Sequence, residues 1–195
     1  MTLSKAAVFL DRDDTIIRDK GYLSDPEGIE ILAGVPEAIR ILNSRSIPVI
    51  VITNQSGIAR GFFDEETLRT IHKRLLALLR EQGAVIDAIY YCPHLSEGAV
   101  RKYAIACTCR KPDTGMLIQA ARDFGLDLPS CFMVGDKPED IEVIHRVGGK
   151  GVFMSTGKHH DTGHRADFIA HDLIQATQWI LSTMRKESCS PDSGT

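Results

Sequence analysis

The chain has 195 residues, of which 43% are hydrophobic and 25% are charged, and its formal net charge is -3. This length and composition predict one globular domain with a substantial core. A slightly negative net charge without a cluster of basic residues argues against binding to nucleic acid. No apolar run approaches the roughly 20 residues that span a membrane.

The amino-terminal acids and the cysteines indicate the compartment. Acidic residues at positions 11, 13 and 14 interrupt the apolar start of the chain too early for a signal peptide, so we expect a cytoplasmic protein. Five cysteines, an odd number, argue against a disulfide framework and favour metal ligation or simple burial. We expect a monomer with no membrane partner and no nucleic-acid partner.

The first predicted strand, residues 7–10, is an apolar run that ends abruptly in Asp11, Arg12, Asp13 and Asp14. Such a run is typical of a strand buried on both faces of a parallel sheet. The acids then emerge at its carboxyl end, where open α/β sheets bind their ligands. Because alternate residues point the same way, Asp11 and Asp13 converge while Arg12 turns aside. The paired charges indicate a divalent cation, or an aspartate nucleophile beside an acid/base carboxyl group; the alternative is a solvated acidic turn.

Turn residues fill positions 16–33, which we expect to form a loop that leans over this site. A helix opened by Pro36 follows, and then a second buried strand at residues 47–52. A hydroxyl and an amide at the carboxyl end of a strand, followed by a glycine, suit hydrogen bonds to an anion. This strand ends in Thr53, Asn54, Gln55, Ser56 and Gly57.

The rest of the chain alternates helices with apolar strands. We predict helices capped by Asp64 and stopped by Gly83, at 115–124, through Ile141 and Ile144, and at 172–186, with strands at 84–91, 131–134 and 151–154. This alternation predicts a parallel sheet with right-handed crossovers. We place the single domain at 1–187 and a disordered tail at 188–195, which is small and polar.

Predicted strand ends and loops carry the residue types that phosphoryl transfer needs. A phosphate ester is anionic, so a metal and basic side chains must neutralise it before a carboxylate attacks phosphorus. We predict Asp11 as the nucleophile, which forms an aspartyl-phosphate, and Asp13 as the acid that protonates the leaving oxygen and the base that activates water. Each residue alone has a simpler structural explanation, but their joint order favours the site. Its predicted members are Asp11, Asp13, Thr53, Asn54, Arg110, Lys111, Asp136, Lys137 and Asp140.

A second cluster lies in a stretch with no regular pattern, where Cys92-x-His94 is followed after twelve residues by Cys107-x-Cys109. Three thiolates and one imidazole make a closed tetrahedral site, which is typical of structural zinc. Ligation orders a segment that lacks a core of its own. The alternative is a set of buried thiols with an incidental histidine. Because Cys109 adjoins two basic residues, we expect this zinc loop to position the cations of the phosphate site.

Four of these motifs together resemble those of the haloacid dehalogenase-type phosphatases, over nearly the whole chain. They are Asp11-Arg12-Asp13, Thr53-Asn54, Lys111 and Gly135-Asp136-x-x-x-Asp140. The resemblance implies a Rossmann-like parallel sheet flanked by helices, with no large cap domain. It also implies magnesium held by Asp11, the backbone carbonyl of Asp13, and Asp136, with phosphate contacts from Thr53 and Lys111.

The zinc cluster, Gly21-Tyr22, the run from Thr53 to Gly61 and Cys109-Arg110-Lys111-Pro112 are similar to one branch of that family. The resemblance implies removal of the 7-phosphate of a heptose 1,7-bisphosphate, in the supply of ADP-heptose or GDP-heptose for envelope polysaccharide. Histidinol phosphate is the alternative substrate, and a non-catalytic phosphosugar-binding protein is a second alternative. The implied substrate contacts are Asp19, Lys20, Gly21, Tyr22, Thr53, Asn54, Gln55, Ser56, Arg110, Lys111 and Lys137.

Asp14 departs from the family pattern, which has glycine at this position. Glycine permits unusual backbone angles, and aspartate adds a charge near the predicted phosphate. We expect an active enzyme nonetheless, because aspartate tolerates the left-handed backbone conformation better than most residues and its side chain can point away.

Overall fold

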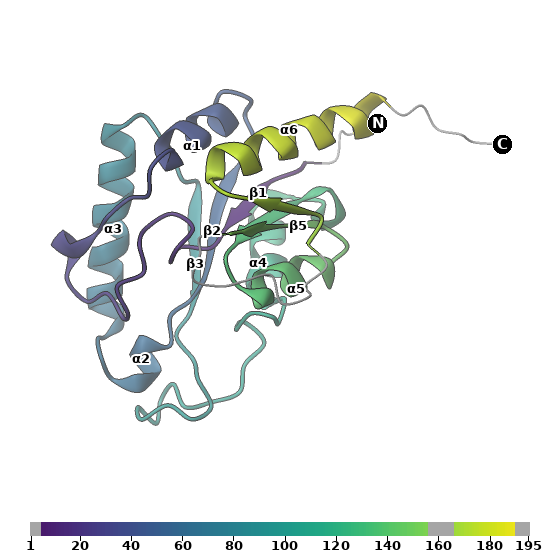
Figure 1. Ribbon diagram of the computed structural model, residues 1–195. Coiled ribbons are helices and arrows are strands. Elements are labelled where there is room, and N and C mark those ends of the chain that lie inside the picture. Colours follow the sequence, from purple (N-terminus) through teal and green to yellow (C-terminus); the bar gives the residue numbers. More distant parts are fainter. Residues whose placement is uncertain (1–4, 156–165, 190–195) are drawn as a thin grey trace.

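The fold is built on a parallel sheet of six strands, in a computed structural model that describes residues 5–155 and 166–189 (Figure 1). The strand order, β3-β2-β1-β4-β5-β6, is that of a Rossmann-like sheet. All neighbouring strands pair in parallel. The strands are β1 (Val8–Leu10), β2 (Val49–Asn54), β3 (Ala88–Cys92), β4 (Phe132–Gly135), β5 (Lys150–Met154) and β6 (Phe168–Ala170).

Helices cover both faces of the sheet, which explains why the central strands are apolar throughout. In β1, Val8 and Leu10 join a core with α1, α3 and α6, whereas Phe9 joins a second core with α4 and α5. Figure 1 shows α6 lying along α1 on the first face. The helices are α1 (Val35–Asn43), α2 (Gly57–Arg60), α3 (Glu65–Glu81), α4 (Gly115–Phe124), α5 (Pro138–His145) and α6 (Leu173–Cys189), with short 3-10 helices η1 (Pro26–Gly28) and η2 (Leu128–Ser130).

The main predicted elements are confirmed where local chemistry defines their ends. Asp64 caps α3 by accepting a hydrogen bond of 2.8 Å from the Thr67 amide. Helix α4 has the predicted bounds, because Gly125 ends it in a left-handed conformation with φ 65°. Residues 16–33 contain only the short helix η1. The predicted loop after Cys92 likewise contains no helix or strand before α4.

Several boundaries differ from the prediction. Strand β3 starts at Ala88 rather than at position 84. The Val49 amide donates to the Asp87 side chain at 2.7 Å, so this amide is not available to a backbone carbonyl of the predicted earlier start. The short elements α2 and β6 were not predicted, since four and three residues are too few to carry a periodic pattern. Helix α6 continues through Cys189, past the predicted domain end at 187, and the rest of the predicted tail lies outside the described residues.

The sheet order places a binding crevice at one point. Sequence order reverses between β1 and β4, which are neighbours in the sheet, and ligands of open α/β sheets bind beside the carboxyl ends of such strands. Asp11 follows β1, Asp136 follows β4, and Thr53 and Asn54 end β2 next to β1. Within the described ranges, no helix is both long enough and apolar enough to cross a lipid bilayer.

Candidate active site and metal centres

A buried lysine joins two carboxylates at the carboxyl edge of the sheet. Lys111 Nζ lies 2.7 Å from Asp11 Oδ1 and also donates to Asp140 Oδ1 and, at 2.8 Å, to the Ile52 carbonyl. All three charged side chains are almost fully buried. Burial opposes the charge on Lys111, but Asp11 and Asp140 outweigh it and raise its pKa. The result is a fixed cation beside Asp11 in a site from which water is largely excluded.

Asp11 is ionised in this setting. Burial alone would raise the pKa of Asp11, but the charges of Lys111 and Lys137 hold that pKa below its ordinary value. An ionised carboxylate has the electron pair that a nucleophile needs. Its position next to two lysines also provides positive charge where an anionic phosphate ester would approach.

Gly135 allows Asp140 to reach the lysine. A Cβ atom on Gly135 would lie 2.2 Å from Asp140 Oδ2, so no other residue fits beside this carboxylate. Asp140 Oδ2 in turn accepts a hydrogen bond of 3.0 Å from the Lys137 amide at the start of α5. Gly135 and Asp140, the first and last residues of the Gly-Asp-x-x-x-Asp motif, therefore act together. The glycine leaves space for the carboxylate that binds Lys111.

The acids near β1 and β4 fit a hard divalent cation. Carboxylate oxygens of Asp11, Asp136 and Asp140 all lie within 4.8 Å of one another, and all three residues are buried. Burial, followed by the charge of Asp11, raises the pKa of Asp136 to about 7. A cation with oxygen ligands would relieve this repulsion. Both oxygens of Asp140 accept hydrogen bonds, from Lys111 and from the Lys137 amide, whereas Lys111 contacts only Oδ1 of Asp11. The donors that fit best are therefore Asp11 and Asp136; the backbone carbonyl of Asp13 stays a prediction.

Asp13 carries the second carboxyl group of the site and is held from two sides. Arg12 donates to it through Nε (3.0 Å) and Nη2 (2.8 and 2.9 Å), and Gln55 Nε2 donates to its Oδ2 at 3.0 Å. The same Gln55 nitrogen donates to Thr53 Oγ1 at 2.8 Å. The prediction that Arg12 turns aside was wrong, because a buried guanidinium needs an anion and takes the adjacent one.

Asp14 has the left-handed conformation that the family glycine would allow, with φ 53°. Its Oδ1 accepts a hydrogen bond of 2.8 Å from the Asp19 amide, so the side chain faces the following loop. This arrangement removes the reason for considering a non-catalytic protein. Asp14 instead fastens the loop that carries the predicted substrate contacts.

A cavity of about 390 Å³ opens beside these residues. Arg110 enters its wall from the zinc loop, where its Nη1 donates to the His94 carbonyl at 3.3 Å. Asp11, Thr53 and Lys111 are buried and do not line the cavity. Lys20 does not line it either, because its Nζ donates to the Gly28 carbonyl at 3.0 Å. The predicted residues in the lining are Asp13, Asp19, Gly21, Tyr22, Asn54, Gln55, Ser56, Arg110 and Lys137, and the lining further includes Arg12, Gly57, Arg60 and Glu139.

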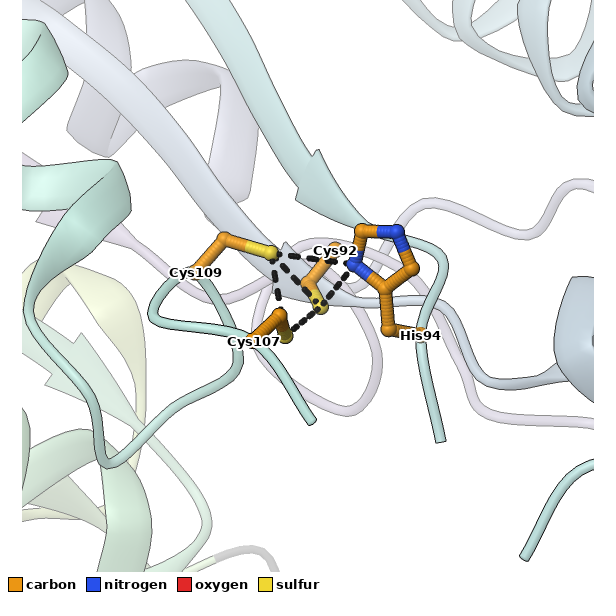
Figure 2. A group of neighbouring side chains, drawn as sticks. All are labelled: Cys92, His94, Cys107 and Cys109. Carbon is orange, nitrogen blue, oxygen red and sulfur yellow. Dashed lines mark hydrogen bonds between the residues drawn. The ribbon is translucent and has the colours of Figure 1, made fainter. Parts of the chain in front are cut away.

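The four predicted zinc ligands converge on one point (Figure 2). Cys109 Sγ lies 3.1 Å from Cys92 Sγ, 3.3 Å from Cys107 Sγ and 3.3 Å from His94 Nδ1. Zinc–sulfur bonds of about 2.3 Å in a tetrahedral site place the sulfur atoms roughly 3.7 Å apart, so the sulfur separations are within a few tenths of an ångström of those that zinc requires. Burial raises the pKa of Cys92 and Cys109, so a cation is what would hold these thiols as thiolates.

The zinc cluster and the phosphate site are joined through the backbone after Cys109. The Lys111 amide donates to Asn54 Oδ1 at 3.0 Å, and Asn54 Nδ2 donates to the Lys111 carbonyl at 3.1 Å. This reciprocal pair ties the end of the zinc loop to the end of β2. An ordered loop therefore delivers Lys111 to Asp11.

A buried carboxylate with two lysines beside it, a second carboxyl group and an acidic cation site together define a site for phosphoryl transfer. A HAD-hydrolase-like family model matches residues 108–176. The chain is 39% identical over 191 residues to D-glycero-D-manno-heptose-1,7-bisphosphate 7-phosphatase of Thermosynechococcus vestitus, covering 92% of this chain and 97% of that one. It is 38% identical over 186 residues to the Escherichia coli K12 enzyme with the corresponding β-anomer name, covering 94% and 92%.

Solved structures agree with the sequence relatives. D,D-heptose 1,7-bisphosphate phosphatase of B. bronchiseptica, complexed with magnesium and phosphate, matches with a TM-score of 0.80 and 32% identity over 92% of this chain and 99% of that chain. A putative HAD-like phosphatase from Mesorhizobium loti matches with a TM-score of 0.82 and 34% identity over 98% and 90%. The chain belongs to the haloacid dehalogenase-like phosphatases, in the family of the heptose-bisphosphate 7-phosphatases, and is a phosphoric monoester hydrolase.

The structure adds contacts that the sequence did not reveal. Arg60 lines the cavity, and its guanidinium lies 5.8 Å from the Tyr22 ring centroid. Tyr22 packs against Phe62 with centroids 4.5 Å apart. His72, on α3, reaches Arg12 across 60 positions of sequence. Arg60 and Phe62 lie shortly after the Thr53 motif, which was a usable signal, whereas nothing in the sequence near His72 points to the site.

Proposed function

We propose that this phosphatase removes the 7-phosphate of D-glycero-D-manno-heptose 1,7-bisphosphate in a magnesium-dependent reaction. The observation that carries the proposal is the buried, lysine-paired Asp11, whose chain neighbours Arg12 and Asp13 line a cavity with further arginines in its wall. The heptose-bisphosphatase names of relatives that align over nearly the whole chain support the substrate.

Asp11 attacks phosphorus, and the bond between phosphorus and the sugar oxygen breaks. Asp13 gives its proton to the departing oxygen, which leaves a phosphoryl group on Asp11. Asp13, now a base, takes a proton from the water that attacks this group, which releases phosphate and restores Asp11. Lys111 and the Thr53 hydroxyl stabilise the phosphoryl oxygens throughout.

Asp11, Asp136 and the backbone carbonyl of Asp13 would hold magnesium. When bound, the cation supplies positive charge that screens the phosphate from the carboxylate nucleophile. A magnesium- and phosphate-bound B. bronchiseptica relative supports this choice of metal. Cys92, His94, Cys107 and Cys109 would hold structural zinc.

The second phosphate of the substrate explains the arginines of the cavity. Arg110 and Arg60 line the cavity wall. Among the hydrogen bonds of the described residues, none joins either arginine to Asp11 or to the Lys111 side chain. A guanidinium binds a phosphate through two parallel hydrogen bonds. We assign them to the phosphate that stays on the sugar. A substrate with one phosphate, such as histidinol phosphate, leaves this role unused.

We base the proposed cellular setting on the chemistry of the predicted zinc ligands. Cys92, Cys107 and Cys109 are free thiols, which persist where thiols stay reduced. This supports a cytoplasmic enzyme, and we propose that it acts as a monomer on a small phosphorylated sugar, in the supply of nucleotide-activated heptose.

The test is phosphate release from heptose 1,7-bisphosphate and from histidinol phosphate, measured side by side with magnesium at matched concentrations. We expect a kcat/KM at least about tenfold higher for the bisphosphate, the scale of one charge-assisted contact. Arg110→Met narrows this preference by raising KM for the bisphosphate. A preference for histidinol phosphate would move the assignment to that substrate and leave the catalytic mechanism intact.

A further inference from the structure

Arg12 is one of the largest fully buried side chains of the protein, with 2% of its surface exposed. Three of its guanidinium contacts go to Asp13, and its remaining terminal nitrogen, Nη1, lies 3.4 Å from His72 Nε2. Burying so large a cation is costly unless every donor finds an acceptor. The guanidinium is therefore held between two acceptors, the adjacent Asp13 and His72, which is 60 positions away in the sequence.

His72 acts as a hydrogen-bond acceptor in this arrangement. Arginine has donors only, so Nε2 must carry a lone pair and the proton of the neutral ring must be on Nδ1. Burial, and secondly the charge of Arg12, lower the pKa of His72 to about 3, which keeps the ring neutral. The ring also packs edge-on against Tyr91, with centroids 5.9 Å apart. Helix α3 thus presents a fixed acceptor to Arg12.

The Asp13 carboxyl group is held in one plane by this support. Arginine and carboxylate are both planar, and their paired contacts resist rotation about the last side-chain bond. Gln55 holds Oδ2 from the other side. Only 18% of the Asp13 side chain is exposed, and Asp13 lines the cavity. Its direction toward a bound ester is set by residues that do not themselves need to touch the leaving group.

We propose that Arg12, supported by the His72 acceptor, is a positioning residue that sets how Asp13 presents its proton to the leaving oxygen. This inference rests on the proposed acid role of Asp13. In that step the bond between phosphorus and the ester oxygen breaks, the electron pair stays on oxygen, and the proton of Asp13 joins it. A poorly aligned acid slows the step in proportion to how much the leaving oxygen needs a proton.

The experiment compares two aryl phosphates of similar shape. Phenyl phosphate has a basic leaving oxygen that needs a proton, whereas p-nitrophenyl phosphate releases an oxygen that leaves readily without one. The quantity is kcat/KM, since it covers the steps up to loss of the leaving group and excludes the later hydrolysis. The ratio of the two values is independent of the fraction of enzyme that is folded, so a destabilised variant remains informative.

Arg12→Lys keeps the charge but loses the planar pair of contacts. We expect kcat/KM for phenyl phosphate to fall about tenfold or more, and that for p-nitrophenyl phosphate to fall by a much smaller factor. Asp13→Asn defines the full extent of this selective loss. Arg69→Lys is the matched control, because Arg69 pairs with Glu66 on the exposed face of α3. We expect this variant to leave kcat/KM for both aryl phosphates unchanged.

His72 supplies a second, independent pair of variants. His72→Gln offers a carbonyl acceptor to Arg12 and should keep the ratio near that of the unmodified enzyme. His72→Leu removes the acceptor and should change the ratio in the same direction as Arg12→Lys. Rescue by the variant that retains an acceptor is not expected from a loss of packing alone.

Equal losses on both substrates in Arg12→Lys and His72→Leu would overturn the proposal and make the two residues structural only. An unchanged ratio in both variants would overturn it as well. If Asp13→Asn itself showed no selectivity for the basic leaving group, the acid role of Asp13 would fall and this inference with it. The heptose assignment would stand in each case, because it is decided by the two substrates tested on the unmodified enzyme.

Discussion

The phosphate site and the zinc loop lie next to each other but are ordered by different forces. Asp11 follows β1, whose residues pair with β2 and β4 and are fully buried, so the sheet itself fixes this carboxylate. The residues between β3 and α4 have no helix or strand, and the sulfur and nitrogen atoms of four side chains meet within them. The packed core fixes the geometry of the phosphate site, whereas the side chains of the zinc loop depend on a bound metal ion to hold them together.

The difference predicts which changes stop the chemistry and which loosen the fold. A change in the buried charges of the first site should abolish turnover, and its effect on stability depends on which charge is left unpaired. A change in the zinc ligands should loosen one segment and leave the sheet intact. The predictions that follow test this contrast, beginning with the largest expected effect.

Removing the nucleophile should give the largest loss of activity. We expect Asp11→Asn to lower kcat by at least about 10³-fold, the scale of a deleted nucleophile, with any phosphate ester as substrate. The fold should survive, because Lys111 keeps Asp140 as its anion. Phosphate release and thermal unfolding check this result.

Lys111→Met is the matched comparison at the same site. It leaves the Asp11 and Asp140 carboxylates buried without their cation, which should cost about 3–5 kcal/mol in the free energy of unfolding. Both variants lose activity, but only this one loses much stability. Retained turnover in Asp11→Asn would refute the nucleophile, and equal stability of the two variants would refute the buried charge array.

Removing zinc should affect the loop before it affects the sheet. In Cys109→Ser, or after chelation, we expect amide hydrogens of residues 93–114 to lose protection from exchange while those of β1, β2 and β4 keep it. Activity should fall about 10- to 100-fold, the usual range for groups that orient an active residue, because Lys111 follows the last ligand. Hydrogen exchange, with zinc content measured on the same samples, tests this.

Cys131→Ser is the control for the zinc experiment. Cys131 is a buried free thiol that hydrogen-bonds the Asp127 carbonyl at 3.3 Å and is not part of the cluster. It should keep full zinc content and normal exchange in the loop. Unchanged exchange and activity in zinc-free protein would contradict a structural metal.

Asp136 should make the metal-free protein less stable as the pH rises. Its ordinary pKa is about 3.9, and burial, followed by Asp11, raises the folded-state pKa to about 7. Between these values the native state binds a proton that the unfolded state releases, so stability falls with rising pH and levels off above pH 7. Asp136→Asn should remove this decline and be the more stable form at pH 8 without metal.

Magnesium should reverse that order. The unmodified protein gains stability by binding the cation, whereas Asp136→Asn has lost a charged ligand and gains less. Thermal unfolding at pH 5 and pH 8, with and without magnesium, gives all four comparisons. Identical pH profiles for the two metal-free proteins would show that Asp136 is ionised without a cation.

Asp14 should have the smallest effect. Asp14→Gly allows the left-handed backbone but loses the hydrogen bond to the Asp19 amide. We expect turnover to change by no more than about threefold, the low end of the range for one hydrogen bond, because this bond does not involve the reacting atoms. Asp14→Ala combines the lost bond with a strained φ and should cost about 1 kcal/mol or more. Steady-state kinetics and thermal unfolding measure both; a large gain in turnover for Asp14→Gly would mean that the natural site is impaired.

The sequence predicted those features that depend on local chemistry or on strand order. The positions of Asp11 and Asp136 at strand ends, and the convergence of the four predicted zinc ligands, could be predicted because each residue stands at the end of an apolar run or in a paired ligand motif. The contacts of Arg12 and Lys20 were not identifiable. Alternation along a strand predicts that Arg12 turns aside, whereas the energetic demand of a buried guanidinium makes it bend back to Asp13. The partner His72 depends on how α3 packs, which no local pattern encodes.

The left-handed backbone at Asp14 has a consequence for how this family is recognised. The residue after the second aspartate has a left-handed backbone conformation, here with φ 53°, and glycine is one of several residue types that can adopt it. A motif search that requires glycine here would discard chains with aspartate, although the Asp14 side chain accepts a hydrogen bond from the loop that follows it. Searches that accept aspartate or asparagine at this point would recover enzymes in which this side chain ties the loop after β1 to the strand end that carries the catalytic residues.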